Sequence, residues 1–259
     1  MAMARFVETF DGDDLDPAVW TTSYLPAWSS RAASAATYRV AGGELSLSIP
    51  PAHPLWCPDL HEGPLRVSAV QTGNRSGPVG SADGQQPFRA GLTVREEQPT
   101  VIGFAPLYGR IEVECRATIS ARSMFSAWMV GLEDRPERCG EICLVEVFGD
   151  TGLVGSGVHP FRDPRLREDF DAIDLGVDVN DWHVYAADWS PDGVEFSVDG
   201  DATRSVAIAP DYPLQLILGV FDFPDRAPGD DPDAVTPVAE LAVRRVEGSS
   251  QARSISLSR

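Results

Sequence analysis

The chain has 259 residues, a formal net charge of −18, and 21 basic side chains that are all arginine. A chain of this length can bury a full hydrophobic core, and an all-β sandwich of this size is commonly a single domain. The acidic balance argues against binding to nucleic-acid phosphates or anionic membranes, and more weakly against sulphated or carboxylated polymers. We therefore expect a neutral partner.

The first half of the chain predicts strands separated by loops. Residues 38–49 (YRVAGGELSLSI) predict two short strands around a Gly-Gly turn. The stretch 50–88 is rich in Pro, Gly and Ser and predicts long surface loops. Further strands are predicted at 108–117, 126–132 and 141–148. In the first of these, apolar side chains alternate with charged ones, as is typical of a strand with one buried face.

The second half of the chain predicts more strands and one helix. Residues 163–170 (DPRLREDF) predict a short helix, because Asp163 can cap its first turn and is followed by a proline. Residues 183–200 predict a hairpin with an SPDG turn between its strands. A strand is predicted at 214–221, and residues 233–246 are interpreted as a closing strand rather than a helix.

Many short strands with Gly- and Pro-containing turns indicate a β-sandwich. We expect one domain over 1–247 and a disordered tail over 248–259. The opening MAMARFVETF lacks the apolar core of a secretory signal, and no stretch approaches the ~18 apolar residues of a membrane span. The chain is expected to be cytoplasmic if it is complete, and secreted if a signal peptide has been removed.

The four cysteines are Cys57, Cys115, Cys139 and Cys143. None forms a CxxC pair, so a zinc site is not expected. If Cys139 and Cys143 both lie in an extended strand, their α-carbons are ~13 Å apart. This distance exceeds the ~7 Å limit for a disulfide. Cys115 lies on the apolar face of its strand and is interpreted as a small buried hydrophobe.

Residues 140–149 (GEICLVEVFG) place Glu141 and Glu146 in an apolar run that predicts a buried strand. A charged side chain is costly there unless it is paired or functional. Regular alternation would point the two glutamates to opposite faces, but one β-bulge near Leu144 or Val145 would bring them to the same face as Cys143. Their carboxyls could then approach to ~5–6 Å, as in a retaining glycosidase. Two solvent-facing glutamates on an edge strand are the alternative.

The segment GEICLVEVFG resembles the signature of glycoside hydrolase family 16, the laminarinase-type β-glucanases, which reads roughly GEIDIVEYFG. Four other segments resemble the family in the same order: FVETFDGDDLDPAVW, YGRIEVECRATISARSMFSAWMVG, HVYAADWSPDGVEFSVDG and YPLQLILGV. Together they cover most of residues 6–222. The resemblance implies an all-β fold, a concanavalin A-like β-sandwich (jelly roll) whose concave sheet forms the sugar cleft.

The resemblance also implies roles for individual residues. Glu141 matches the family's nucleophile and Glu146 its general acid/base. Trp128 matches a tryptophan at the floor of the cleft that stacks on a sugar, with a core tryptophan as the alternative. His159 falls where the family has a histidine that reaches the leaving-group side, with a structural histidine as the alternative. Trp56 matches no motif, but its position in the loop region could add a sugar platform.

The sequence departs from the family motif at its middle aspartate, which is Cys143 here. Such an aspartate can orient the nucleophile, and its charge helps to keep the acid/base protonated. A thiol is neutral at pH 7 and a weak hydrogen-bond partner, so we expect a lower pKa for Glu146 than in relatives that carry the aspartate. Met124 replaces a subsite tryptophan and Gly219 an asparagine, so the substrate specificity of well-known members does not carry over.

Three functions are compatible with these residues. The first is a retaining endo-glycosidase that hydrolyses or transglycosylates a β-linked neutral polysaccharide such as a β-1,3-glucan. The second is a catalytically impaired glycan-binding protein on the same fold. The third is a thiol enzyme that uses Cys143, which requires His159 within hydrogen-bond reach of the sulfur.

The expected partner is a polysaccharide or oligosaccharide, with no nucleic acid and no membrane, and the chain is expected to be a monomer. Some relatives hold a calcium ion on the convex face. This sequence offers no clear ligand set for such an ion, so no metal or other cofactor is expected.

Overall fold

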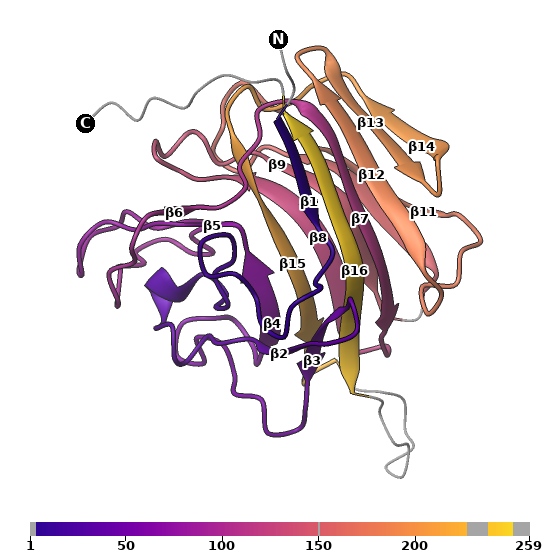
Figure 1. Cartoon of the computed structure of the whole chain (residues 1–259). Helices are drawn as coiled ribbons and strands as arrows, with labels where there is room; N and C mark the ends of the chain where they lie inside the picture. The colour runs from indigo at the N-terminus through magenta and orange to yellow at the C-terminus, as the bar shows by residue number, and fades with distance from the viewer. Residues whose placement is uncertain (1–3, 150, 227–237, 251–259) are drawn as a thin grey trace.

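The structure is a computed structural model that describes residues 4–149, 151–226 and 238–250. In these residues the regular structure is all β-strand apart from a short 3-10 turn, η1 (Pro26–Trp28). An eight-stranded and a six-stranded antiparallel sheet pack face to face (Figure 1), and β5 (Gly73–Asn74) and β6 (Val101–Ile102) form a small ribbon. The predicted all-β sandwich is confirmed.

The eight-stranded sheet has the order β14-β13-β12-β7-β16-β3-β2, and β1 also pairs with β16. Its strands are β1 (Ala4–Glu8), β2 (Thr37–Val40), β3 (Leu45–Ile49), β7 (Gly109–Thr118), β12 (His183–Ser190), β13 (Gly193–Val198), β14 (Asp201–Val206) and β16 (Ala239–Ser250).

The six-stranded sheet has the order β11-β10-β9-β8-β15-β4. Its strands are β4 (Arg66–Gln71), β8 (Ser123–Gly131), β9 (Glu141–Phe148), β10 (Leu153–His159), β11 (Asp169–Asp174) and β15 (Leu214–Asp222). The predicted strands 38–49, 108–117, 126–132, 141–148, 183–200 and 214–221 are all present within a few residues of their expected bounds.

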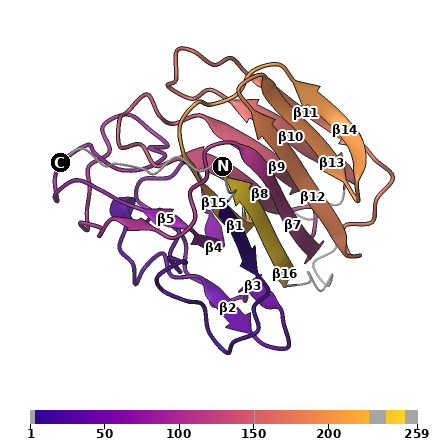
Figure 2. The ribbon, with the colours of Figure 1, turned by 45° about the horizontal axis from the view of Figure 1, so that its top comes forward.

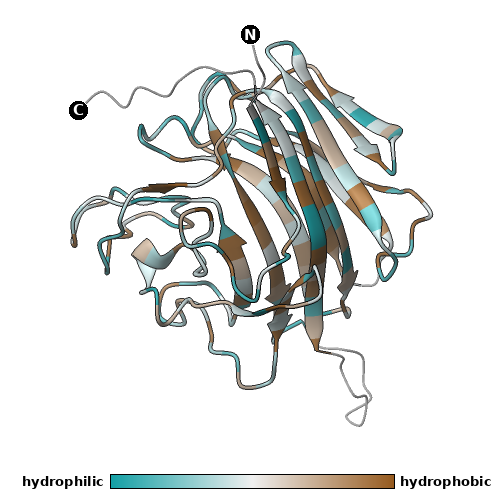
Figure 3. Cartoon of the chain, in the orientation of Figure 1, coloured by the Kyte–Doolittle hydropathy of each residue, from teal (hydrophilic) through white to brown (hydrophobic). Residues whose placement is uncertain are grey.

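The main hydrophobic core lies between the two sheets. On β7, Ile111, Val113 and Cys115 point into it, while the residues between them face solvent. Figure 3 shows the resulting alternation of hydrophobic and hydrophilic residues along the strands of the eight-stranded sheet. Facing side chains from the six-stranded sheet, such as Met129 and Leu216, complete this layer. The alternation read from the sequence of β7 therefore predicted which of its faces is buried.

A second apolar layer covers the outer face of the six-stranded sheet. Loops from the first hundred residues gather beside β4 and β15 (Figures 1 and 2). They bring Trp28, Trp56 and Leu92 against Trp128 and Ile217 of the sheet. All of these residues are buried. A face that would otherwise be open is thus covered by the chain's own loops.

Two local predictions were wrong. Residues 163–170, predicted as a helix, form a turn that runs into β11. The Asp163 carboxylate does accept the backbone N–H of Arg165, as a capping residue would, but β11 then pairs with β10 along its length. Sheet pairing thus overrides a weak local helix preference. The stretch 50–88, predicted as surface loops, contains β4 at the edge of the six-stranded sheet.

The C-terminal boundary also differs from the prediction. The closing strand is present as β16, but it continues to Ser250 instead of ending before residue 248. Gly248 pairs with Phe6 of β1 and Ile111 of β7, so the beginning of the predicted tail belongs to the sheet. The remaining tail, 251–259, lies outside the described residues, as do residues 233–237 of the predicted closing strand.

Candidate active site

A β-bulge in β9 brings the two glutamates to one face. In the pairing with β8, Glu141 lies opposite Val130 and Cys143 opposite Trp128, but Val145 then lies opposite Ala127. Leu144 is therefore the extra residue, and the pairing of β9 with β10 is also shifted at this place. The predicted bulge is present. It turns Glu146 onto the outer face of the sheet, together with Glu141 and Cys143.

Glu141 lies deep in the covered outer face of the sheet, with 7% of its surface exposed. The side-chain amide of Gln86, from the covering loops, donates to its Oε2 at 3.3 Å. Burial, and then the nearby negative charges of Glu146 and Glu168, raise the pKa of Glu141 well above its usual value. The Gln86 amide acts in the opposite direction because it stabilises the carboxylate.

Glu146 is only partly buried and lies between Ser126 of β8 and Gly155 of β10. Burial raises the pKa of its carboxyl. Desolvation thus favours the protonated form of Glu146 even though the motif has a cysteine, Cys143, in place of the aspartate. Since like-charge repulsion acts on both glutamates, ionisation of one disfavours ionisation of the other. We assign the first ionisation to Glu146, because Glu141 is buried more deeply.

Cys143 lies between the two glutamates and is fully buried in the apolar layer of the outer face. Burial, together with the charges of Glu146 and Glu141, raises the pKa of its thiol. A reactive cysteine needs the opposite, an exposed thiol with a lowered pKa. The sulfur lies 3.9 Å from the Ser126 hydroxyl, whereas the His159 Nδ1 pairs with Glu168. This environment opposes the thiol-enzyme hypothesis.

Trp128 and Trp56 are both buried in the layer over the outer face. Trp128 packs near the rings of Tyr24 and Phe221, with ring centroids 6.4 Å and 6.0 Å away. The Trp56 indole donates to the Tyr24 carbonyl at 3.1 Å, and its ring packs on Phe88. Trp128 therefore lies on the same face as the glutamates, under the loops. Its stacking role and that of Trp56 remain predictions.

His159 ends β10 and lies directly opposite Glu141 in the sheet. Its Nδ1 is 2.7 Å from Glu168, and its ring stacks on Phe170 at 4.7 Å between centroids. The same β10–β9 pairing places Gly157 opposite Cys143 and Gly155 opposite Glu146. On the β10 side, no side chain therefore lies beside Cys143 or Glu146, and at these paired positions of β10 the imidazole of His159 is the one side chain opposite a glutamate.

Three residues at the site carried no signal in the sequence: Gln86, Glu133 and Arg162. Glu133 is buried, accepts the backbone N–H of Gln86 and forms an ion pair with Arg162. Burial raises the pKa of Glu133 to about 7, although Gln86 and Arg162 act in the opposite direction. These residues come from three separate loops and belong to no motif, so only the fold brings them together.

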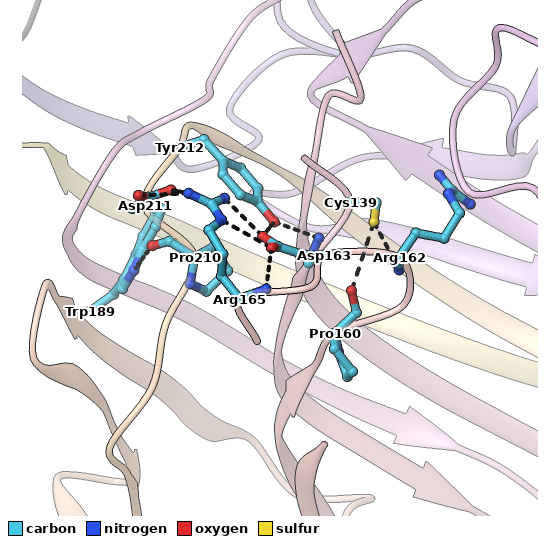
Figure 4. A network of polar contacts seen from close by, with 10 residues as sticks. Cys139, Pro160, Arg162, Asp163, Arg165, Trp189, Pro210, Asp211 and Tyr212 are labelled. Carbon is cyan, nitrogen blue, oxygen red and sulfur yellow. Dashed lines mark hydrogen bonds and ion pairs between the residues drawn. The ribbon is translucent and has the colours of Figure 1, made fainter. Parts of the chain in front are cut away.

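A polar network fixes the start of β9 (Figure 4). The Tyr212 hydroxyl accepts the backbone N–H of Gly140 at 2.7 Å and donates to Asp163 at 2.9 Å. Asp163 also holds Arg165. A side chain at position 140 would collide with Leu166 and with the Tyr212 hydroxyl, which explains why a glycine precedes Glu141. The network therefore positions the first carboxyl of the site.

A family model described as glycosyl hydrolases family 16 matches residues 101–222. The resemblance to glycoside hydrolase family 16 is confirmed. The matched segment contains Glu141, Cys143, Glu146, Trp128 and His159. Trp56 and Gln86 precede it, so the loops that cover the site lie outside the part of the chain that matches the family 16 model. Comparison with curated proteins finds no match.

Solved structures show the same fold. The chain is similar to a GlcNAcα1-4Gal releasing endo-β-galactosidase from Clostridium perfringens, with a TM-score of 0.80 and 24% identity over 95% of this chain. It spans 62% of the length of that protein. It is also similar to the laminarinase from Rhodothermus marinus, with a TM-score of 0.64 and 19% identity over 98% of this chain and 100% of the other.

The laminarinase catalytic domain from Thermotoga maritima gives a TM-score of 0.60 and 18% identity over 96% of this chain and 98% of the other. With these neighbours, the predicted concanavalin A-like jelly roll is confirmed, and the match to the family 16 model supports a relationship to the glycoside hydrolases. Within the described residues, no group of three or more acidic, His or Cys side chains could hold a metal ion. No helix in that part of the chain is long and apolar enough to cross a membrane.

The first prediction concerns Tyr212. Tyr212→Phe removes the hydroxyl that bonds Gly140 and Asp163, so the free energy of unfolding should fall by about 1–3 kcal/mol. Tyr38→Phe is the matched control, because it removes a hydroxyl that bonds the exposed Asp14 and should cost less. Unfolding in denaturant measures both variants. Equal losses would contradict a special role for the buried network.

The second prediction concerns Glu141 and pH. Because folding raises its pKa, the protonated carboxyl stabilises the fold below the ordinary glutamate pKa, and this stability is lost as pH rises through the folded pKa. Glu141→Gln has no ionisable carboxyl at this position, so it should not lose this stability as the pH rises. The difference in unfolding free energy between Glu141→Gln and the parent should therefore increase with pH. The increase should reach up to about 1.4 kcal/mol per pH unit between the unfolded and the folded pKa of Glu141.

Thermal and denaturant unfolding from pH 4 to pH 8 measures this difference. Glu137→Gln, at an exposed position, is the control and should follow the parent at every pH. A constant difference between Glu141→Gln and the parent across the range would show that Glu141 does not resist ionisation in the fold.

Proposed function

We propose that the chain is a retaining endo-glycosidase that hydrolyses, or transglycosylates, a β-linked neutral polysaccharide. The observation that carries the proposal is the bulge at Leu144, which puts Glu141 and Glu146 on one face of β9 and close enough to raise the pKa of Glu141 by repulsion. Paired carboxyls on one face are what a double-displacement mechanism requires. The family 16 match over the same residues supports it.

In this mechanism the Glu141 carboxylate attacks the anomeric carbon while Glu146 protonates the departing oxygen. The bond to the leaving sugar breaks, and an ester between the sugar and Glu141 forms. Glu146, now ionised, then takes a proton from water, and the resulting oxygen nucleophile displaces Glu141. A sugar hydroxyl in place of water gives transglycosylation. Two carboxyls are sufficient for both steps.

The protonation state of the free protein limits the rate of this mechanism. The reaction needs ionised Glu141 and protonated Glu146, but the deeper burial of Glu141 favours the opposite arrangement. Both arrangements carry one proton, so the pH–rate profile stays bell-shaped and only its height is reduced. The Gln86 amide favours the productive arrangement because it donates to the Glu141 carboxylate.

Two substrate classes are proposed for a first test. The laminarinase neighbours support a β-1,3-glucan, as the sequence resemblance also does. The higher TM-score of the endo-β-galactosidase supports a β-galactoside-containing glycan. Both are neutral polymers or oligomers, in agreement with the net charge of −18. Reducing-sugar release from each class separates them.

A catalytically impaired glycan-binding protein is the second candidate, and the burial of the site supports it. Glu141 is 7% exposed under the Gln86 loop and Cys143 is fully buried, so a sugar must displace covering residues before attack. Binding of an oligosaccharide by the parent protein without any release of reducing sugar would favour this candidate over the enzyme.

The third prediction tests the catalytic roles. Glu141→Gln and Glu146→Gln should each remove most hydrolysis, with losses of about a hundredfold or more for a positioned acid/base. The fold should persist, since a neutral amide replaces a carboxyl of similar shape. Reducing-sugar release and circular dichroism measure the two effects. Glu195→Gln, on the outer face of β13, is the control and should retain activity.

Azide rescue assigns the roles of the two glutamates. With an activated aryl β-glycoside, azide should restore turnover of Glu141→Ala and yield an α-glycosyl azide, because azide replaces the missing nucleophile. Rescue of Glu146→Ala should yield a β-glycosyl azide through the intermediate on Glu141. The opposite pairing of product and variant would exchange the two roles.

A further inference from the structure

Glu133 is a buried acid that the proposed mechanism does not use. It lies in the loop between β8 and β9, and 3% of the residue is exposed. One of its carboxyl oxygens accepts the backbone N–H of Gln86, and the other pairs with Arg162 of the turn after β10. A buried carboxylate is costly unless donors satisfy it, and here the two donors come from two different loops. Glu133 therefore fastens the Gln86 loop to the turn after β10.

The backbone on both sides of the contact between Glu133 and Gln86 is in an unfavourable conformation. Gln86 has a φ of 44° and Glu133 a φ of 55°, in the left-handed region that residues other than glycine rarely adopt. Such conformations persist where the surrounding contacts hold them, and they are concentrated at functional sites. Arg75, which also pairs with Asp83, donates to the Glu133 carbonyl. Glu133 is thus held at its backbone as well as at its carboxylate.

The position of the Gln86 backbone determines what its side chain reaches. The Gln86 amide nitrogen donates to Glu141 Oε2 at 3.3 Å. Burial raises the pKa of Glu141, and this hydrogen bond acts in the opposite direction because it stabilises the carboxylate. The bond is longer than the usual N–H···O distance, so a small displacement of the Gln86 backbone would break it. The contact that fixes this backbone therefore also affects the ionisation of Glu141.

We propose that Glu133 is a positioning residue for the proposed glycosidase: it holds the Gln86 backbone where the Gln86 amide reaches the Glu141 carboxylate, the form that attacks the sugar. The proposal rests on the proposed glycosidase function. Glu133 acts through Gln86 and not on the sugar itself.

The charge on Glu133 depends on the groups around it. Burial raises the pKa of Glu133 to about 7, while the Gln86 N–H and the Arg162 and Arg75 guanidiniums act in the opposite direction. The Cys139 thiol lies near the same carboxylate, and burial raises the pKa of that thiol. The ionised carboxylate that serves both donors is therefore the dominant form of Glu133 above the pKa of this residue.

Titration of the Glu141 carboxyl tests the proposal. Carbon NMR of protein labelled in its glutamate carboxyls follows this group, and its resonance is identified by its loss in Glu141→Gln. Gln86→Ala should raise the pKa of Glu141, because a donor to the carboxylate is lost. Glu133→Ala should also raise it, although the loss of a nearby negative charge would by itself lower it. The double variant should show no rise beyond that of Gln86→Ala.

Kinetics above the pKa of Glu133 give the second measurement, on the substrate that the parent cleaves best. Gln86→Ala and Glu133→Ala should each lower kcat/KM about three- to tenfold, as for the loss of one long hydrogen bond. The double variant should be no slower than Gln86→Ala, because Glu133 has no separate effect once the Gln86 amide is gone.

Asp222→Ala is the matched control. Asp222 is also a buried acid held by arginines, Arg66 and Arg122, so this variant removes a comparable ion pair at the end of β15. It should leave the Glu141 titration and kcat/KM at the parent values, and melting curves identify the variants that fold. If Glu133→Ala does not fold, Glu133→Gln replaces it. This variant keeps the side-chain volume and should shift the Glu141 titration in the same direction by less.

Three results would overturn the proposal and leave the glycosidase function intact. They are an unchanged or lowered Glu141 pKa in the folded Glu133 variant, a further rise or a further loss of kcat/KM in the double variant, and an equal effect of Asp222→Ala. If the parent cleaves no substrate, the glycosidase function fails instead. The titrations alone then decide whether Glu133 positions Gln86 at Glu141.

Discussion

The site depends on the cost of holding two carboxyls of the same charge in one buried strand. Burial alone disfavours their ionised forms, and repulsion between Glu141 and Glu146 adds to this effect. A regular strand would separate them onto opposite faces. The bulge at Leu144 removes that separation, so the fold accepts an electrostatic cost at the place where the proposed chemistry needs one proton shared between two acids.

Cys143 belongs to the apolar layer that the covering loops form over the six-stranded sheet. The loops bury the outer face of the six-stranded sheet, and Cys143 fills a position in this apolar layer. An aspartate there would place a third acidic group in the same desolvated region, which would raise the cost of ionising Glu141 further. Burial of Glu146 already favours its protonated form, which is the effect that the family's middle aspartate otherwise provides. The replacement by cysteine is thus physically consistent with a covered site.

The turn after β10 is tied to the start of β9, the strand that carries the two glutamates. Arg162 of this turn pairs with Glu133, and Asp163 of the same turn accepts a hydrogen bond from Tyr212, whose hydroxyl also holds Gly140 at the start of β9. The Cys139 sulfur adds a second link because it accepts the Arg162 backbone N–H. The network in Figure 4 therefore ties the position of this turn to the start of β9.

The sequence alone predicted the strands and the sandwich, because these follow from local alternation, and it offered the bulge that pairs Glu141 with Glu146 as one of two interpretations of residues 140–149. It misjudged 163–170 because pairing of β11 with β10 outweighed a weak helix preference. Only the tertiary structure decided that the site is covered, that Gln86 contacts Glu141, and that Glu133 joins Gln86 to Arg162. Gln86, Glu133 and Arg162 lie on separate loops, and packing between loops depends on contacts that no local pattern encodes.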